Sequence, residues 1–162
     1  MFELYQVGLG FVALLIGIFV WAGIVWSNRS KAQSMKIVSP EEIDFSTRGS
    51  SGFYVATTFA DRPLDRVSAH GLGFGGKATV EVSKDGINVS RTGEKSFRIA
   101  KSSLIDIART SVVIDKAVEK DGLLSLRWRL GDALLESHFR FPSSSERDQV
   151  AVTVANLLVG AK

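Results

Sequence analysis

Cysteine is absent from the chain, and histidine occurs only twice, at His70 and His138. The lack of cysteine excludes disulfide bonds, thiol nucleophiles and thiolate metal sites, and it agrees with a reducing compartment. No helix-spaced pair of histidines and no carboxylate cluster surrounds either histidine, so we expect no metal site and interpret both as surface residues. No nucleophile with a base and no pair of catalytic carboxylates can be assembled. The sequence therefore predicts a protein that is not an enzyme and needs no cofactor.

Charge is also missing, from residue 4 to residue 28. At about 1.5 Å per residue, an apolar helix over 4–26 would be about 35 Å long, enough to cross a bilayer core of about 30 Å. The start of the chain, with Glu3 and no basic residue, differs from a cleaved signal peptide. The pattern predicts an uncleaved, single-pass transmembrane anchor over 1–27.

Basic residues follow the predicted span at Arg29, Lys31 and Lys36, and none precedes it. Since basic flanks stay on the cytoplasmic side, we expect a cell-membrane protein with its N-terminus outside and its C-terminal domain in the cytoplasm. The part after the span has about four more positive than negative side chains. This balance suits weak contact with anionic lipid but falls short of a nucleic-acid-binding pattern. Ala13 and Gly17 have the small-residue spacing that lets two such helices pair, which leaves a homo-oligomer open.

Residues 28–52 are rich in Ser and charged residues and end in a Gly and Ser run, which predicts a flexible juxtamembrane linker. The remainder, 53–162, has room for one domain with its own core. Apolar residues there alternate with polar ones, which predicts strands at 53–59, 78–83, 87–91, 96–99, 104–110, 123–130 and 134–141. Asp85-Gly86 and Gly131-Asp132 fit tight hairpin turns, so we expect antiparallel pairing, with Trp128 in the core.

The period changes near the end of the chain. Ser143 precedes Glu146 by three residues, which is typical of a capping box at a helix start. One helical face then collects the apolar side chains Val150, Val154, Leu157, Leu158 and Ala161. We expect an amphipathic helix over about 144–159 that covers one end of a curled sheet.

This order of elements resembles the pleckstrin-homology-like (PH-like) barrel. The segments 84–89 (Lys-Asp-Gly-Ile-Asn-Val), 97–99 (Phe-Arg-Ile), 103–107 (Ser-Leu-Ile-Asp-Ile) and 139–142 (Phe-Arg-Phe-Pro) resemble its bacterial membrane-protein members. The whole chain is similar to single-pass actinobacterial proteins that are often loosely labelled as transporters. The resemblance implies an N-terminal transmembrane helix followed by a mainly β domain, a seven-stranded antiparallel PH-like barrel capped by the C-terminal amphipathic helix. A lipocalin-like or other small barrel is the alternative.

A glycine-rich stretch over 71–77 matches a Gly-x-Gly-x-x-Gly pattern and most of a phosphate loop. A phosphate loop needs Ser or Thr after its lysine, where this chain has Ala78, and it needs a helix where 78–82 alternates like a strand. We interpret the stretch as a mobile loop, with nucleotide or anion binding as the alternative. By resemblance, it lies where PH domains receive inositol phosphates. The candidate anion-binding residues are Arg62, Arg66, Gly73, Gly75, Gly76 and Lys77.

A second basic set lies on the last predicted hairpin: Arg127, Arg129, His138 and Arg140. These side chains form either a solvated face opposite Trp128 or a surface for an acidic protein partner. The leading hypothesis is a non-enzymatic interaction or scaffold module that presents a PH-like domain to a protein partner. The alternatives are a nucleotide- or anion-binding protein that uses the loop 71–77, and an accessory subunit of a membrane transporter.

Overall fold

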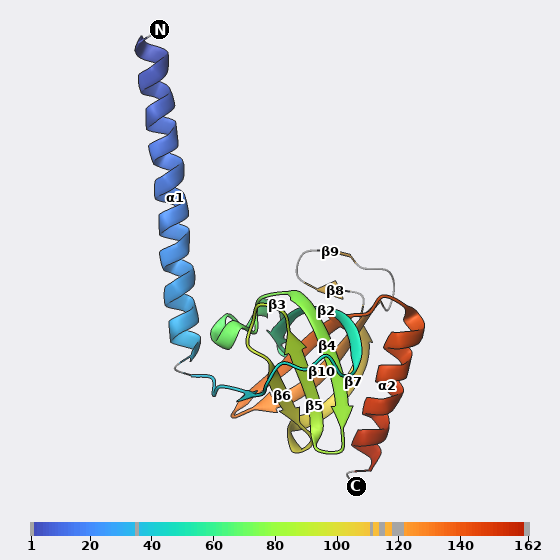
Figure 1. The fold of residues 1–162 in the computed structure, drawn as a ribbon. Coiled ribbons are helices and arrows are strands. Elements are labelled where there is room, and N and C mark those ends of the chain that lie inside the picture. Colours follow the sequence, from blue (N-terminus) through green and yellow to red (C-terminus); the bar gives the residue numbers. More distant parts are fainter. Residues whose placement is uncertain (1, 35, 111, 114–115, 118–121, 161–162) are drawn as a thin grey trace.

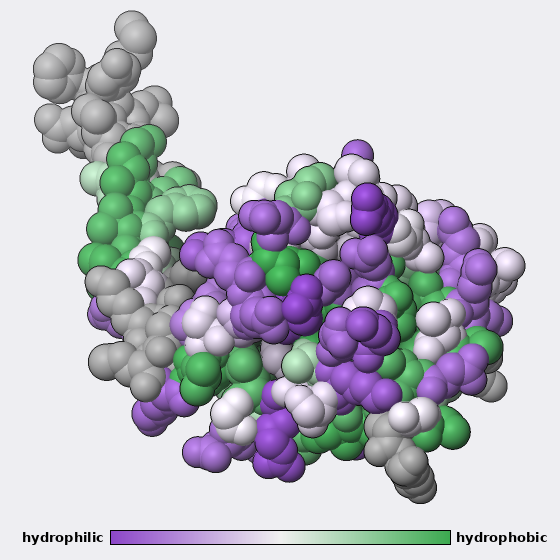
Figure 2. All heavy atoms as spheres, turned by 60° about the horizontal axis from the view of Figure 1, so that its bottom comes forward, coloured by the Kyte–Doolittle hydropathy of each residue, from purple (hydrophilic) through white to green (hydrophobic). Residues whose placement is uncertain are grey.

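A long helix and a β-rich domain make up the chain in Figure 1. A computed structural model describes residues 2–34, 36–110, 112–113, 116–117 and 122–160. Helix α1 spans Phe2–Ser34 and leads into the domain, where it contacts the short 3-10 helix η1 at Ala69–Gly71. In Figure 2, apolar side chains gather along the described part of α1, whereas the visible face of the domain is mostly hydrophilic.

The prediction of a transmembrane span over 1–27 needs correction. A helix does form, but within the described part of the chain no helix is both long and apolar enough to cross a membrane. The helix then continues through polar residues to Ser34 instead of ending at the predicted boundary. Ala13 and Gly17 lie one turn apart on α1, and their pairing with a second copy stays a prediction.

One antiparallel sheet carries the domain. Its strands in the described residues are β1 (Glu41–Glu42), β2 (Ser50–Phe59), β3 (Arg62–Arg66), β4 (Gly76–Ser83), β5 (Gly86–Arg91), β6 (Phe97–Ala100), β7 (Leu104–Thr110), β10 (Leu123–Leu130) and β11 (Ala133–Arg140). Their order is β1-β6-β5-β4-β2-β11-β10-β7, with β3 added on β2. Two short strands, β8 (Val112–Val113) and β9 (Lys116–Ala117), form a separate pair. Strands occur at all seven predicted positions.

The predicted closed, seven-stranded barrel is wrong. The described sheet has nine strands and is open, because no ladder joins its two end strands, β1 and β7. A short 3-10 helix, η2 (Lys101–Ser103), separates β6 from β7, and the outer edge of β6 pairs with β1 instead. The additional strands β1 and β3 are short and polar, so neither has the apolar alternation that revealed the other seven.

The chain before β2 lies along the sheet. Ile37 is buried, Glu41 and Glu42 pair with β6, and the Ile43 amide donates to the Ser96 carbonyl at 3.2 Å. The Ser46 amide donates to the Ser90 hydroxyl at 3.0 Å. Residues 36–49 thereby position one wall of the site described below.

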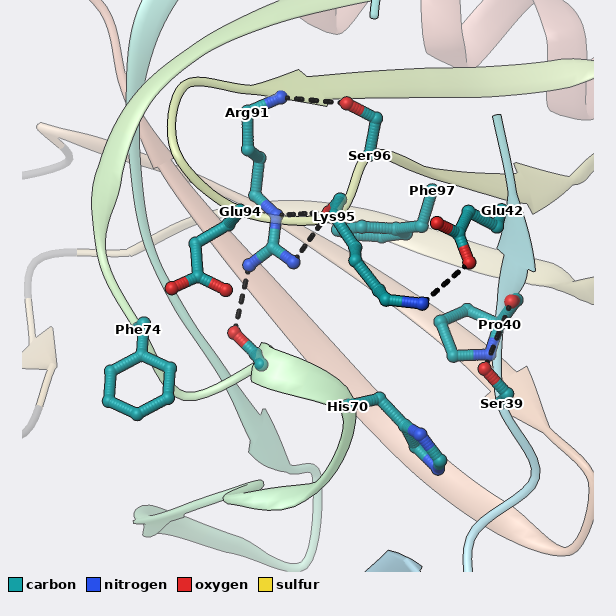
Figure 3. Close-up of a pocket in the computed structure, with 11 residues that line it drawn as sticks. Ser39, Pro40, Glu42, His70, Phe74, Arg91, Glu94, Lys95, Ser96 and Phe97 are labelled. Carbon is teal, nitrogen blue, oxygen red and sulfur yellow. Dashed lines mark hydrogen bonds and ion pairs between the residues drawn. The ribbon is translucent and has the colours of Figure 1, made fainter. Parts of the chain in front are cut away.

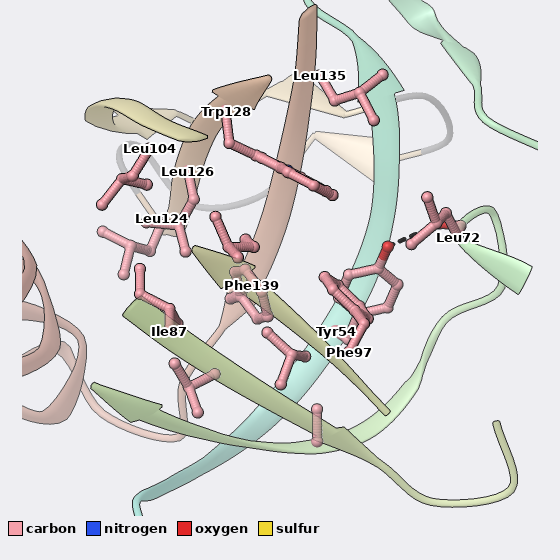
Figure 4. Close-up of a cluster of buried hydrophobic side chains, with 14 of the residues drawn as sticks. Tyr54, Leu72, Ile87, Phe97, Leu104, Leu124, Leu126, Trp128, Leu135 and Phe139 are labelled. Atoms are coloured by element: carbon pink, nitrogen blue, oxygen red, sulfur yellow. Dashed lines mark hydrogen bonds between the residues drawn. The ribbon is translucent and has the colours of Figure 1, made fainter. Parts of the chain in front are cut away.

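The core lies between the two halves of the sheet (Figure 4). A line of hydrogen bonds also runs through it. Tyr54 packs edge-on against Phe97 and Phe139, and Phe97 stacks on Trp128, which is buried as predicted. The Tyr54 hydroxyl donates to the Leu72 carbonyl at 2.7 Å. Further bonds join the Tyr54, Thr57 and Ser137 hydroxyls and the Trp128 indole N–H, so these buried polar groups are satisfied.

Helix α2 (Ser144–Val159) occupies the predicted residues and begins with the predicted cap. The Glu146 amide donates to the Ser143 hydroxyl at 3.2 Å, and that hydroxyl lies 3.2 Å from the Glu146 carboxylate. Val150 and Val154 are buried, and α2 contacts β4, β7 and β10. Helix α2 therefore covers the apolar surface between β4 on one side of the open sheet and β7 and β10 on the other. Ala161, predicted on the same face, lies outside the described residues.

Candidate functional site

A pocket of about 400 Å³ opens where three segments meet (Figure 3). Strand β1 and the residues before it form one wall, η1 and the following loop form the second, and the turn between β5 and β6 forms the third. Its lining residues are Ser39, Pro40, Glu42, His70, Gly71, Phe74, Arg91, Glu94, Lys95, Ser96 and Phe97. The pocket exists because β1 adds to the edge of β6, which brings residues far apart in sequence to one place.

Arg91 forms the floor of this pocket and is only 3% exposed. Its Nε and Nη2 donate to the Lys95 carbonyl at 2.9 and 2.7 Å, and its Nη1 donates to the Gly71 carbonyl at 2.9 Å. The guanidinium also lies 5.0 Å from the ring centre of Tyr54 and 5.3 Å from that of Phe97. Burial lowers the pKa of Arg91, and the nearby Tyr54 and Glu94 oppose that change. Arg91 thus joins the turn, η1 and the aromatic core.

Charged side chains of both signs surround the mouth of the pocket. The Lys95 ammonium lies 2.8 Å from the Glu42 carboxylate, and Glu94 is exposed beside Gly71 and Arg91. His70 has a φ of 53°, in the left-handed region, and its Nε2 lies 2.8 Å from the Ile37 carbonyl oxygen. Two carboxylates therefore balance the two permanent cations of the pocket.

The polar side chains of this pocket make their hydrogen bonds to neighbouring parts of the domain. Its hydroxyl groups already have partners, since Ser39 donates to the Pro40 carbonyl and Ser96 accepts from the Arg91 amide. The histidine contact runs to Ile37, so the hydrogen bonds of the described residues do not link His70 to a nucleophile. Over the same described residues, no three His, Asp or Glu side chains gather as a metal ion would require.

The predicted anion-binding set does not converge on one point. Arg62 pairs with Asp65 at 2.9 Å and lies 4.4 Å over the ring of Phe59. Arg66 directs its guanidinium to the Gly73 carbonyl at 3.5 Å. Lys77 lies on β4, just before the predicted strand 78–83 and not in a loop, and it is exposed.

The glycine-rich loop packs closely on neighbouring backbone. A Cβ added to Gly73 would lie 2.9 Å from the Val67 carbonyl oxygen, and one added to Gly75 would lie 2.9 Å from that of Val55. The Phe74 amide donates to the Gly71 carbonyl at 3.2 Å, and the Leu72 carbonyl accepts from the Thr57 amide at 2.8 Å. These contacts give the glycines a structural role, in which they allow the loop to approach β2.

The second predicted set divides between the surface and the interior. Arg129 and Arg140 are exposed, and Arg127 lies 3.6 Å from the Glu136 carboxylate. His138 is only 3% exposed, so its interpretation as a surface histidine is wrong. Its Nδ1 lies 2.7 Å from the Ser125 hydroxyl, and its Nε2 lies 3.0 Å from the Thr58 hydroxyl.

The pair formed by Ser125 and His138 is a feature that the sequence pattern missed, because the two residues are thirteen positions apart on paired strands. Burial lowers the pKa of His138 to about 4. Both side chains are almost wholly buried, so the pair joins β10 and β11, and through Thr58 it also reaches β2. Its observed role is structural.

Register brings one residue of each predicted basic set together. Phe53 on β2 lies opposite Lys77 on β4 and also opposite Arg140 on β11. These three side chains line a second hollow, of about 590 Å³, on the outer side of the sheet. The strand order that creates this arrangement cannot be derived from spacing in the sequence alone.

The comparisons with known proteins agree with this architecture. The family model described as "Bacterial PH domain-like" matches residues 35–155, which include the strands, the pocket and most of α2. No curated protein matches the chain. The predicted resemblance to PH-like domains is confirmed, and the chain belongs to the bacterial PH domain-like family.

Proposed function

We propose that this domain is a non-enzymatic interaction module that binds a protein partner at the pocket around Arg91. A PH-like domain suggests a module for protein or lipid interaction. The observation that carries the proposal is a pocket with a fixed floor and a charge-balanced mouth, in which Arg91 is held by two carbonyls and Lys95 faces Glu42.

Rigidity supports binding at this place. Arg91 and Phe97 are buried and in contact, so the floor is already ordered before a ligand arrives. Phe74 is 45% exposed at the margin and offers an aromatic surface of the kind that is enriched in protein interfaces. A partner side chain that enters the pocket would therefore meet a prepared surface.

The charge balance favours a protein partner over a phosphorylated lipid headgroup. A headgroup with several negative charges would meet Glu42 and Glu94 as well as the two cations. A peptide segment supplies both signs of charge together with backbone donors and acceptors, so it suits a pocket of both signs. The protein partner is thus the better match.

Site-specific photo-crosslinking of the full chain in cells tests this proposal. A benzophenone amino acid replaces Phe74 at the margin of the pocket, and in the control it replaces Leu64, which is 68% exposed on β3. We expect a discrete protein adduct from position 74, none of the same size from position 64, and loss of the adduct in a Lys95→Glu background. Equal adducts from both positions, or adducts to lipid alone, would contradict the proposal.

Co-sedimentation with vesicles tests whether the pocket binds anionic lipid instead of a protein. The full chain is mixed with phosphatidylcholine vesicles that contain or lack phosphatidylglycerol. We expect the anionic lipid to cause no change in binding that depends on Lys95. A change that Lys95→Glu abolishes would assign the pocket to lipid instead. The predicted cytoplasmic location and the nucleotide-binding alternative for the loop 71–77 stay predictions.

A further inference from the structure

The hollow on the outer side of the sheet, called here the Phe53 groove, lies across three neighbouring strands. Its lining residues are Ser51, Gly52, Phe53, Lys77, Ala78, Thr79, Thr92, Arg140, Phe141 and Pro142. None of them lines the pocket around Arg91. The Phe53 groove is therefore a separate surface of the domain.

The centre of the groove is an exposed aromatic ring. Phe53 is 46% exposed, although its neighbour Tyr54 is fully buried in the core. The alternation of the strand explains this contrast, because successive side chains point to opposite faces of a sheet. Gly52 beside it has no room for a side chain, since an added Cβ would lie 2.8 Å from the Arg140 carbonyl oxygen. The close approach of β2 and β11 leaves the Phe53 ring accessible from outside.

Two cations flank this ring, one on each neighbouring strand. Lys77 and Arg140 are both paired in register with Phe53, and both are exposed. At a strand spacing of about 4.8 Å, their backbones lie roughly 10 Å apart. Neither forms an ion pair with another residue that the structure describes, and no lining residue is acidic. The groove thus presents two uncompensated positive charges with an apolar surface between them.

We infer that the Phe53 groove binds an acidic peptide segment in which carboxylates flank an aromatic or aliphatic side chain. The apolar side chain packs on Phe53, and carboxylates on either side pair with Lys77 and Arg140. A single phosphate does not match this arrangement, because the two cations lie on opposite sides of an aromatic ring. A flat lipid surface does not fill a hollow between Thr92 and Pro142. A peptide chain has both the length and the alternating chemistry that the groove requires.

Fluorescence anisotropy with the full chain tests the inference. The probe is a dye-labelled, end-capped seven-residue peptide with Phe at its centre and two Asp or Glu residues on each side. Its matched control carries Asn and Gln in place of the acidic residues. We expect the acidic peptide to bind, the neutral peptide to bind about tenfold more weakly or less, and added salt to weaken the acidic complex.

Four variants locate the binding. Lys77→Glu and Arg140→Glu each weaken binding of the acidic peptide by about tenfold or more, and Phe53→Ser weakens it through loss of apolar contact. The control is Arg129→Glu, an exposed arginine of the same charge on β10, opposite Leu134 and about 20 Å along β11 from Arg140. We expect Arg129→Glu to leave binding unchanged. Thermal unfolding of each variant confirms that it is folded.

The other outcomes overturn the inference. Absence of binding by the acidic peptide at low salt would contradict the inference. An equal loss of affinity in Arg129→Glu would mean that the peptide is held only by diffuse attraction to positive charge. Binding of phosphatidylglycerol vesicles or inorganic phosphate that Lys77→Glu abolishes, without peptide binding, would assign the groove to that ligand. The pocket proposal is tested by Lys95→Glu at a different place, so the two fail independently.

Discussion

The pocket around Arg91 and the Phe53 groove differ in how their charges are used. In the pocket, Arg91 is buried against two carbonyls, and Lys95 pairs with Glu42. In the groove, Lys77 and Arg140 are exposed without an ion-pair partner among the described residues. The comparison teaches that the buried cation Arg91 holds the fold together, while the exposed cations Lys77 and Arg140 are available for a ligand. Substitution of Arg91 should therefore change stability, and substitution of Lys77 or Arg140 should change binding.

The largest stability effect is expected from Arg91→Met. This change removes the donors to the Gly71 and Lys95 carbonyls and the cation over Tyr54 and Phe97. The loss of three hydrogen bonds from a buried guanidinium and of its ring contacts should lower the free energy of unfolding by about 4 kcal/mol. Urea denaturation measures the loss.

Lys77→Met is the matched control for that experiment, because it removes a cation from the exposed groove. We expect its free energy of unfolding to stay within about 0.5 kcal/mol of the unsubstituted protein. If both substitutions cost the same, the distinction between a structural and an available cation would be wrong.

The next largest effect is a loss of folding stability at low pH, which we expect from the buried His138 on β11. His138 lies two residues before Arg140, and burial lowers its pKa from 6.5 to about 4. The unfolded chain takes up a proton as the pH falls below about 6.5, whereas the folded chain does so only near pH 4. The folded state should therefore lose about 3 kcal/mol of stability between pH 6.5 and 4, and no more below that range.

His138→Gln tests this assignment, because glutamine does not titrate. We expect a smaller slope of unfolding free energy against pH between 4 and 6.5, even if the variant is less stable throughout. Parallel slopes for the two proteins would mean that another group causes the acid sensitivity.

The smallest effect is expected at the mouth of the pocket, from Lys95→Gln. The ion pair with Glu42 has a side-chain exposure of 72% for Lys95 and 59% for Glu42. Exposed pairs of this kind contribute about 0 to 1 kcal/mol, so the loss should be below about 0.5 kcal/mol. A loss of several kcal/mol in urea denaturation would contradict this estimate and show that the exposed pair contributes as much to stability as Arg91 does.

Patterns within single segments predicted much of the fold. All seven strands with apolar alternation form, and the capping pair Ser143 and Glu146 marks the start of α2. Strands β1 and β3 were missed because Glu41–Glu42 and Arg62–Arg66 carry no apolar face. The edge that β1 occupies on β6 also explains why the sheet is open and not the predicted closed barrel.

The pocket around Arg91 and the Phe53 groove both depend on the order of strands in the sheet, which local sequence patterns do not reveal. The sequence pattern places Lys77 and Arg140 in separate basic sets, yet both flank Phe53 because β2 lies between β4 and β11. No pattern indicates Arg91, since nothing in its local sequence distinguishes a buried arginine from an exposed one. His138 looked like part of a solvated face, but its hydroxyl partners on β10 and β2 are distant in sequence.

The comparison between the two hollows is tested most directly by an NMR titration of the ¹⁵N-labelled full chain with the acidic peptide. We expect amide shift changes to concentrate at Phe53, Lys77 and Arg140 and to spare Gly71, Glu94 and Lys95. Changes centred on the pocket residues, or none at a saturating peptide concentration, would contradict the assignment of the available cations to the Phe53 groove.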